Sequence, residues 1–453
     1  MVKKFEQWQD MIGRLYPELT KEGADDADRN RPLSRTLTFQ VTDKCSLACK
    51  YCYQINKGVR RMKFETAKKL IDGLLEGDER FTNYLSVENS PGIVIEFIGG
   101  EPFLEPKLIE QICDYFVKRA TELCHPWATM FMISIASNGV HYFEPDVQHF
   151  VNKYAPMLSL SVTIDGNKEL HDSCRVFPDG RPSYDLAVAA CEDWMAKGHY
   201  MGSKITIAPG NIEYLVDAVK HMVDLGYNEI NANCVYEEGW TMEHATTFYY
   251  KMKELADYWI DNDLVESHYL ALFSETFFHP KEPTDIGTWC GGAGFMLSCD
   301  PDGFLYPCIR FMESSLGTDQ KPLPIGHVDY GIAQTACDKN CVECLNKVNR
   351  KTQCTGDAEK CFDCPIAEGC SDCAAYNYQV NGTVESKAIY ICPMHKARAL
   401  ANAYFWNKWY QKTNQKKVFN IYIPEDWALE IISKEEWEIL KEMEAKNESR
   451  IEQ

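Results

Sequence analysis

The chain has 453 residues, of which 45% are hydrophobic and 25% charged, and this length allows a large core with two or three domains. Its 47 Lys and Arg against 67 Asp and Glu give a formal net charge of −20, which argues against non-specific binding to nucleic acid phosphates or anionic lipid. The sequence shows no apolar run long enough for a signal peptide or a membrane span, so we expect a cytoplasmic protein whose 20 cysteines bind metal rather than form disulfides.

From Thr36 onward, apolar strands alternate with amphipathic helices. Before that point, the pattern indicates a helix near 3–15 and a polar loop. The predicted strands lie near 36–42, 92–99, 129–137, 158–164, 203–208 and 229–236, and the predicted helices near 64–77, 106–123, 146–154, 184–198 and 212–226. Ser183 and Asn211 are predicted to cap the last two helices. Repeated strand–helix alternation predicts an α/β fold with a parallel sheet and right-handed crossovers.

Two motifs follow the first two predicted strands. Cys45, Cys49 and Cys52 come after the first strand at C-x3-C-x2-C spacing, and three thiolates can hold three irons of a [4Fe–4S] cluster. Zinc sites also use paired cysteines, so the spacing alone leaves both metals open. Gly99-Gly100-Glu101-Pro102 comes after the second strand, where glycines allow the backbone to approach a small ligand closely.

Together, these motifs resemble the radical SAM superfamily, in which the open iron of the cluster binds S-adenosylmethionine (SAM). The resemblance implies a partial (β/α)6 barrel with the Gly-Gly-Glu-Pro turn on the amino group of SAM. Tyr51, the aromatic residue before the third cysteine, matches the family motif. The resemblance further implies that Ser137 and Asn138 contact the ribose and that Ser161 and Arg175 bind the SAM carboxylate. From the residues alone, Ser161 could equally face a helix and Arg175 could be a solvated loop charge.

A second cysteine array begins at Cys290 and includes Gly303-x4-Cys308 and the run KCFDCPIAEGCSDC. It resembles the SPASM domain, a C-terminal Cys-rich extension that holds two auxiliary [4Fe–4S] clusters, so the expected total is three clusters. The resemblance assigns to the distal cluster Cys361, Cys364, Cys370 and Cys392. It assigns to the proximal cluster Cys290, Cys308 and Cys373, with either Cys299 as fourth ligand or an iron site open to a substrate thiolate. Cys370 and Cys373 are separated by two residues where the family has three, which leaves the geometry of the last ligand open.

The remaining cysteines carry weaker signals. Cys337, Cys341 and Cys344 repeat the C-x3-C-x2-C spacing and Cys354 follows, but neither a preceding strand nor a Gly-Gly-Glu-Pro turn accompanies them. They hold an extra metal, supply the missing ligand or are surface thiols. Five isolated cysteines are predicted to be ordinary buried thiols: Cys113, Cys124, Cys174, Cys191 and Cys234.

We expect a multidomain chain. Residues 241–278 are aromatic-rich and predicted helical, and helices are predicted after His395 and over the last residues. The predicted boundaries are 1–35 for an N-terminal helix and loop, 36–240 for the radical SAM partial barrel, 241–289 for bridging helices, 290–395 for the SPASM domain and 396–453 for a helical tail. Because Cys290 directly follows the bridging helices, we expect the proximal cluster to face the barrel mouth.

The resemblance implies a metal-binding oxidoreductase that cleaves SAM reductively to a 5′-deoxyadenosyl radical and modifies a peptide. From Thr36 to about Trp406 the chain looks most like maturases of Cys-rich ribosomal precursor peptides, which form thioether or related crosslinks in the biosynthesis of ribosomally made, modified peptides (RiPPs). The implied partners are the precursor peptide and a reductant such as flavodoxin or ferredoxin. Only 44 residues precede Cys45, too few for a winged-helix leader-binding domain, so we expect a separate leader-binding protein.

Two alternatives stay open at this point. A near relative would be an enzyme like the anaerobic sulfatase maturases, which form formylglycine. A different class would be a non-enzymatic electron carrier with several clusters, against which the Gly-Gly-Glu-Pro turn argues because a carrier needs no small-molecule site. Cleavage of SAM by the reduced protein separates these classes.

Overall fold

The computed structural model describes residues 34–452, apart from 237–238, 285–289, 291, 293–295, 318 and 333–347. The helix predicted near 3–15 therefore lies outside the described residues, as do Cys337, Cys341 and Cys344. Within the described part of the chain, no helix is long and apolar enough to span a membrane.

Parallel strands form the centre of the molecule. β1 to β4 lie side by side in one sheet, and β5 and β6 pair in parallel in a second sheet that ends with the short strand β7. A parallel bridge between Ser161 and Gly202 joins β4 to β5, which makes β1 to β6 one continuous series and confirms the predicted partial (β/α)6 barrel. The bounds are Ser34–Thr42 (β1), Gly92–Gly99 (β2), Phe131–Ser137 (β3), Leu158–Val162 (β4), Ser203–Ile207 (β5), Glu229–Cys234 (β6) and Tyr269–Leu270 (β7).

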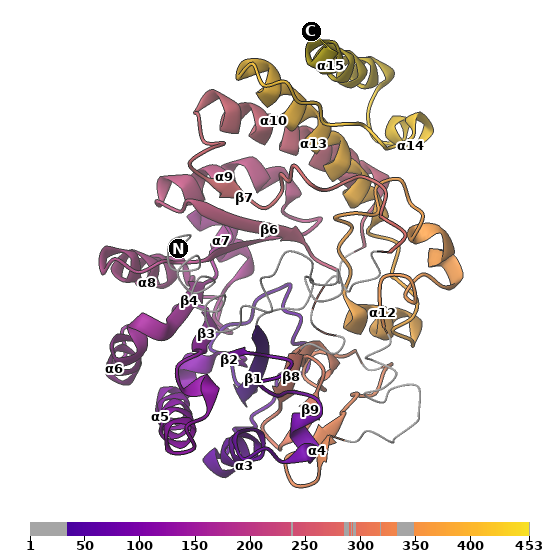
Figure 1. Ribbon diagram of the computed structural model, residues 1–453. Helices are drawn as coiled ribbons and strands as arrows, with labels where there is room; N and C mark the ends of the chain where they lie inside the picture. Colours follow the sequence, from indigo (N-terminus) through magenta and orange to yellow (C-terminus); the bar gives the residue numbers. More distant parts are fainter. Residues whose placement is uncertain are drawn as a thin grey trace.

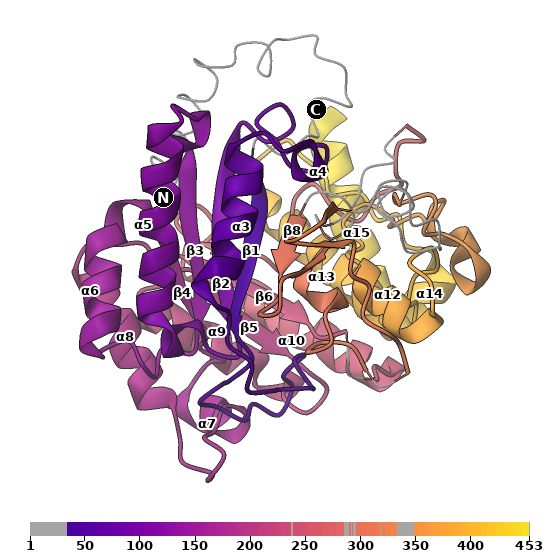
Figure 2. The same cartoon turned by 90° about the horizontal axis from the view of Figure 1, so that it is seen from below.

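Amphipathic helices cover the outer face of these strands (Figures 1 and 2). Leu70, Ile71 and Leu74 form the buried stripe of the first of them, at the spacing that one helix face requires. Pro106 and Pro145 each begin a helix, at the position where the missing N–H costs nothing. The helices are α3 (Phe64–Leu75), α4 (Glu79–Thr82), α5 (Pro106–Glu122), α6 (Pro145–Tyr154), α7 (Lys168–Cys174), α8 (Tyr184–Ala196) and α9 (Leu215–Asp224).

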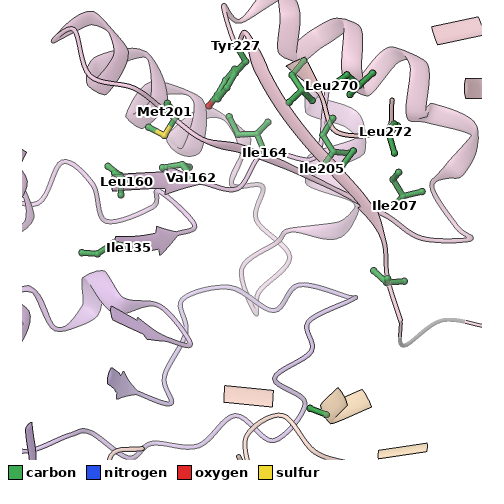
Figure 3. Packing of buried hydrophobic residues seen from close by; sticks show 14 of the residues in the cluster. Ile135, Leu160, Val162, Ile164, Met201, Ile205, Ile207, Tyr227, Leu270 and Leu272 are labelled. Carbon is green, nitrogen blue, oxygen red and sulfur yellow. The ribbon is translucent and has the colours of Figure 1, made fainter. Parts of the chain in front are cut away.

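The core lies between this helical layer and the strands. Phe39 of β1 and Phe97 of β2 are fully buried, and their rings stack with centroids 5.9 Å apart. Where β4 approaches β5, the buried side chains include Ile164, Ile205 and Ile207 (Figure 3). Each such side chain contributes roughly 1.5–3 kcal/mol through burial, so the core holds the strand ends of the barrel in fixed positions.

The Cys-rich region adds strands to the barrel sheet. β8 (Met296–Cys299) pairs in parallel with β1 on the side opposite β2, and the antiparallel strands β9 (Phe304–Tyr306), β10 (Gly326–His327) and β11 (Gly331–Ile332) extend the sheet further. The turn from β8 to β9 contains Gly303, whose positive φ of 98° favours glycine. Sequence analysis did not predict this pairing between the two regions.

Helices from both halves of the chain pack together on one side of the barrel (Figure 1). α10 (Met242–Asp261) lies against α13 (Cys392–Lys412), and α14 (Glu425–Leu429) and α15 (Lys434–Glu452) pack on α13. The helices predicted in the tail are confirmed. The helix predicted over 241–278 is wrong beyond Asp261, because Asp263 has a positive φ of 55° and the chain continues irregularly into β7.

The two predicted helix caps are also wrong. Ser183 and Asn211 occupy N-cap positions, but neither side chain accepts a capping hydrogen bond. Ser183 Oγ donates instead to Arg175 O at 2.6 Å, and Asn211 Nδ2 donates to Thr206 O at 2.9 Å. Both side chains therefore fix the loop that precedes their helix. The helix predicted at 212 begins as a short 3₁₀ turn before α9.

Candidate active site

The loop after β1 carries Cys45, Cys49 and Cys52, and the Gly-Gly-Glu-Pro turn after β2 packs directly on that loop. Gly100 N donates to Thr42 O at 3.0 Å, and Glu101 N donates to Lys44 O at 2.8 Å. A Cβ atom on Gly99 would lie 2.5 Å from Thr42 O, and one on Gly100 would lie 2.2 Å from Lys44 O. The glycines are therefore required by the close approach of the chain's own cysteine loop, which differs from the ligand-based reason given by the sequence.

Glu101 links this turn to the end of β3. Its carboxylate is 1% exposed and accepts hydrogen bonds from Ser137 Oγ (2.8 Å), Asn138 N (2.8 Å) and Phe103 N (3.0 Å). Burial raises the pKa of Glu101, and these three donors oppose the shift. Ser137 Oγ also accepts from Gly139 N at 3.0 Å, so its hydrogen bonds here are made within the protein, and its predicted ribose contact stays a prediction.

Asn138 connects the end of β3 to the cysteine loop. Its Nδ2 donates to Ser46 Oγ at 3.1 Å and lies 3.9 Å from Cys45 Sγ. Burial raises the pKa of Cys45 to about 11, although the nearby charge of Lys57 opposes this. The free thiol is therefore protonated at neutral pH and would lose its proton on binding a metal, which deprotonates a coordinating thiol.

A buried network joins the cysteine loop to the end of β4. Arg175 Nη1 donates to Tyr51 Oη at 2.9 Å, and Tyr51 Oη donates to the fully buried carboxylate of Asp165. Burial raises the pKa of Asp165, while the charge of Arg175 opposes the rise. The positive charge of Arg175 also acts on Cys49, whose pKa is raised by burial. Arg175 Nε is buried and has no hydrogen-bond partner among the described residues.

Backbone hydrogen bonds fix Arg175 on both sides. Ala48 N donates to Val176 O at 2.8 Å, and Lys50 N donates to Cys174 O at 3.0 Å, so the cysteine loop runs alongside the loop that carries Arg175. The position of the guanidinium is therefore set by the same segment that carries the three cysteines.

A cavity of about 520 Å³ brings these residues together, which is within the usual range for small-molecule sites. All the predicted SAM-site residues except the buried Pro102 line it: Cys45, Cys49, Tyr51, Cys52, Gly99, Gly100, Glu101, Ser137, Asn138, Ser161 and Arg175. Sequence reasoning missed further lining residues: Tyr53, Gln54, Lys57, Lys204, Thr206, Asn233 and Arg310. Most of these follow a cysteine or lie on β5 and β6, where strand-end position was the only available signal.

The cysteines assigned to the proximal cluster lie together and reach this cavity. A Cβ atom on Gly292 would lie 3.4 Å from Cys290 Sγ and 3.7 Å from Cys308 Sγ. Burial raises the pKa of Cys308, and the neighbouring thiols Cys373 and Cys290 raise it further. Cys373 lines the same cavity as the cysteine loop, so the two cysteine groups share one space.

Cys299 lies apart from that group. It is fully buried in β8 opposite Phe39 of β1, and its Sγ lies 3.5 Å from Asp300 O. Burial raises its pKa, and the charge of Asp300 raises it further. This placement favours a core position over the predicted role as fourth proximal ligand.

The cysteines assigned to the distal cluster form another group, and each of them interacts electrostatically with others of the set Cys361, Cys364, Cys370 and Cys392. Cys354 joins them, because it contributes to the raised pKa of Cys361 after burial. Burial alone would raise the pKa of Cys370, but His395 lowers it to about 7. All these thiols are free, and within the described residues no three Cys, His, Asp or Glu side chains already stand in a metal-binding arrangement.

The isolated cysteines fit their prediction only in part. Cys113 and Cys191 are buried, and Cys174 and Cys234 are half-buried. The prediction is wrong for Cys124, which is exposed because it follows the end of α5 in a turn with a positive φ of 50°.

Comparison with known proteins gives distant relatives, and no family model matches the chain. It is 27% identical over 195 residues to an uncharacterised protein of Methanocaldococcus jannaschii, covering 43% of this chain and 60% of the relative. It is 21% identical over 347 residues to the radical SAM cyclopropyl synthase TigE of Paramaledivibacter caminithermalis, covering 72% and 69%. It is 22% identical over 293 residues to the antilisterial bacteriocin subtilosin biosynthesis protein AlbA of Bacillus subtilis, covering 63% and 57%.

Among solved structures, the fold is similar to that of native anSMEcpe with bound AdoMet and Kp18Cys peptide. The TM-score is 0.59 at 16% identity, and the match covers 84% of this chain and 99% of that chain. The chain is thus a homologue of radical SAM enzymes and has their fold, while it spans only about three fifths of the first relative's length.

Proposed function

We propose that the chain is a radical SAM enzyme that oxidatively modifies a ribosomally made precursor peptide. The observation that carries the proposal is the shared cavity, which is lined by Cys45, Cys49 and Cys52 and also by Cys373 of the second cysteine group. A site for SAM and an electron-accepting site would then both face the substrate. An electron carrier would need no cavity of this size.

The residues present fit the group that the fold implies. Three thiols follow one strand. Arg175 lines the same cavity, and its buried Nε, which has no hydrogen-bond partner among the described residues, could donate to a carboxylate. We assign Cys45, Cys49 and Cys52 to the cluster and Arg175 to the SAM carboxylate. When bound, the cluster and SAM would supply one-electron cleavage of the sulfonium and hydrogen-atom abstraction from the substrate.

The chain's own residues would hold and orient these groups. The Gly-Gly-Glu-Pro turn keeps the cysteine loop in place through Gly100 and Glu101, and the bonds around Arg175 fix its guanidinium. We assign Cys290, Cys308 and Cys373 to a proximal auxiliary cluster and the group around Cys370 to a distal one. A reductant such as flavodoxin or ferredoxin and a separate leader-binding protein would complete the system.

The first test is SAM cleavage by the triple variant Cys45→Ala/Cys49→Ala/Cys52→Ala. The wild-type protein, reconstituted without oxygen, should bind roughly twelve irons and the variant about four fewer, one cubane's content. The reduced wild type should release 5′-deoxyadenosine and the variant should not. Cys124→Ala is the matched control, because this exposed thiol lies outside all three groups. Wild-type rates of SAM cleavage in the triple variant would refute the assignment.

The second test concerns the substrate. Small Cys-rich peptides encoded beside the gene should lose a pair of hydrogen atoms when incubated with the reduced enzyme and SAM, as a thioether or related crosslink requires. Mass spectrometry with fragmentation would locate the change. Conversion of a Ser or Cys to formylglycine would instead favour the sulfatase-maturase alternative, and cleavage-competent protein that modifies none of these peptides would count against a peptide substrate.

A further inference from the structure

We propose that the side-chain amide of Gln54 binds a main-chain peptide group of the substrate, which rests on the proposed function only in assuming that a peptide enters the cavity. Gln54 lines the cavity and is 4% exposed. Its Nε2 is buried, and within the described part of the chain it has no hydrogen-bond partner. A buried N–H without an acceptor is costly, so this atom marks a position where a ligand oxygen would be favourable.

The place of Gln54 in the cavity points to the substrate rather than to SAM. Two residues further on, Asn56 Nδ2 donates to Glu313 O at 2.9 Å and to Leu316 O at 2.8 Å, which attaches this segment to the C-terminal Cys-rich region. The residue before Gln54 is Tyr53. The guanidinium carbon of Arg310 lies over the Tyr53 ring, 5.0 Å from the ring centroid. Most of the residues expected to contact SAM itself lie elsewhere in the chain, at the ends of β2, β3 and β4.

The chemistry of a carboxamide matches a peptide group. It offers one donor side and one acceptor side, as a backbone amide does, and it carries no charge. The other polar residues that line the cavity include cations such as Lys57 and Arg310, which suit carboxylates. A hydrogen bond from Gln54 to the substrate main chain would form whatever side chain the contacted substrate residue carries. It would therefore position the reacting residue without imposing a sequence requirement at the contacted position.

The proposal and a purely structural role of Gln54 predict opposite effects of Gln54→Leu on stability. A structural role predicts a lower urea midpoint of unfolding. Leucine has nearly the size of glutamine and needs no hydrogen-bond partner. If Nε2 is unpartnered in the free protein, Gln54→Leu removes an unsatisfied donor and should leave the urea midpoint of unfolding unchanged or higher. Gln148 is the matched control, because its Nε2 donates to Tyr142 O at 2.7 Å outside the cavity, so Gln148→Leu should lower that midpoint.

The experiment uses the anaerobically reconstituted holoenzyme and the precursor peptide that gave product with the wild type. For Gln54→Leu we expect an unchanged SAM affinity and unchanged uncoupled cleavage, with peptide affinity weakened about tenfold, the size of one lost hydrogen bond to a buried partner. Gln54→Glu, which loses the donor, should also weaken peptide binding, while Gln148→Leu should not.

Three results would overturn the proposal. Peptide affinity equal to wild type in a folded Gln54→Leu protein would show that the amide does not bind the substrate. A loss of SAM affinity with peptide affinity unchanged would assign the amide to the cofactor. A lower unfolding midpoint in Gln54→Leu, matching Gln148→Leu, would show a structural partner. Failure of the proposed function is distinct, because the wild type itself would then neither cleave SAM nor modify peptide.

Discussion

Asp165 is the residue whose replacement tests the architecture of the site most directly. Its fully buried carboxylate accepts from Tyr51 Oη and, at 3.4 Å, from Thr206 N, and it lies beside the charge of Arg175. The change Asp165→Asn keeps the shape and an acceptor oxygen but removes the negative charge. We expect Arg175 to keep its 2.9 Å bond to Tyr51 and to lose its counter-charge.

The magnitude follows from the burial of two opposite charges that Tyr51 Oη links, since Asp165 and Arg175 do not form a direct ion pair; the cost of breaking a direct pair is therefore an upper bound. Removing one partner of a buried ion pair costs about 3–5 kcal/mol, because the other charge is left uncompensated. Two observations place Asp165→Asn at the lower end, about 3 kcal/mol. The guanidinium keeps a neutral acceptor in Tyr51 Oη, and burial already raises the pKa of Asp165, so the wild type gains less from the ionised carboxylate. Domains are stable by roughly 5–15 kcal/mol, so the variant should still fold.

The assay is urea unfolding without oxygen, followed by measurement of SAM affinity on the folded proteins. Asp179→Asn is the control, because this exposed carboxylate pairs with the exposed Arg181 at the surface and should contribute little. We expect Asp165→Asn to lower the free energy of unfolding and to weaken SAM binding, since Arg175 would no longer be held in place. Equal stability and equal SAM affinity in the two variants would refute this account of the network.

Three further predictions test other parts of the site. Gly100→Ala should abolish iron binding at the cysteine loop, because the added Cβ would lie 2.2 Å from Lys44 O. Gly210→Ala is the control, since a Cβ there meets open space, and it should retain the iron. Equal iron contents in the two variants would contradict the packing argument. Burial and the nearby guanidinium of Arg175 lower the pKa of His171 from 6.5 to about 3. The unfolded chain therefore takes up a proton at this histidine before the folded protein does, and the free energy of unfolding falls as the pH drops below about 6.5. His171→Gln should therefore make unfolding free energy fall less steeply between about pH 6 and 4, and an unchanged slope would exclude this role. Cys354→Ser should keep about twelve irons per chain, whereas a loss of about four would make Cys354 a distal ligand.

The sequence predicted the barrel well because its strands leave a strong local signal. β2 is a nearly uninterrupted apolar run, which suits a sheet covered by helices, and β4 alternates buried Leu and Val with Ser at the period of a strand. By contrast, β8 is four residues long and depends on pairing with β1, more than 250 residues earlier, which local pattern does not encode. The burial of Cys299 could not be predicted for the same reason, because only the register of β8 against β1 shows that it lies in the core; its role as fourth proximal ligand stays a prediction.

The sequence predicted which residues belong to the site. It predicted only in part the contacts that require those residues. The motif identified Gly99 and Gly100, but the atoms that exclude a Cβ there belong to the backbone of the cysteine loop. Asp165 stood at the predicted strand end and was not selected, because its partners Tyr51 and Arg175 come from separate loops. Such networks depend on distances between loops, and spacing along the chain does not give these distances.

The β1–β8 pairing also explains how one cavity can hold two cysteine groups. β1 leads directly into the loop with Cys52, and β8 lies beside it in fixed register, from Thr36 opposite Met296 to Phe39 opposite Cys299. The segment that follows β9 carries Cys308 and, directly after it, Ile309 and Arg310, which line the cavity. Tyr53 lies near both cysteine groups: burial raises its pKa, the charge of Arg310 opposes the rise, and Cys52 and Cys308 each raise it further. A Cys-rich domain joined by a flexible linker would not keep these groups at a constant separation. Pairing it to the first barrel strand through main-chain hydrogen bonds makes their separation a property of the sheet, which the proposed electron transfer from a substrate between them would require.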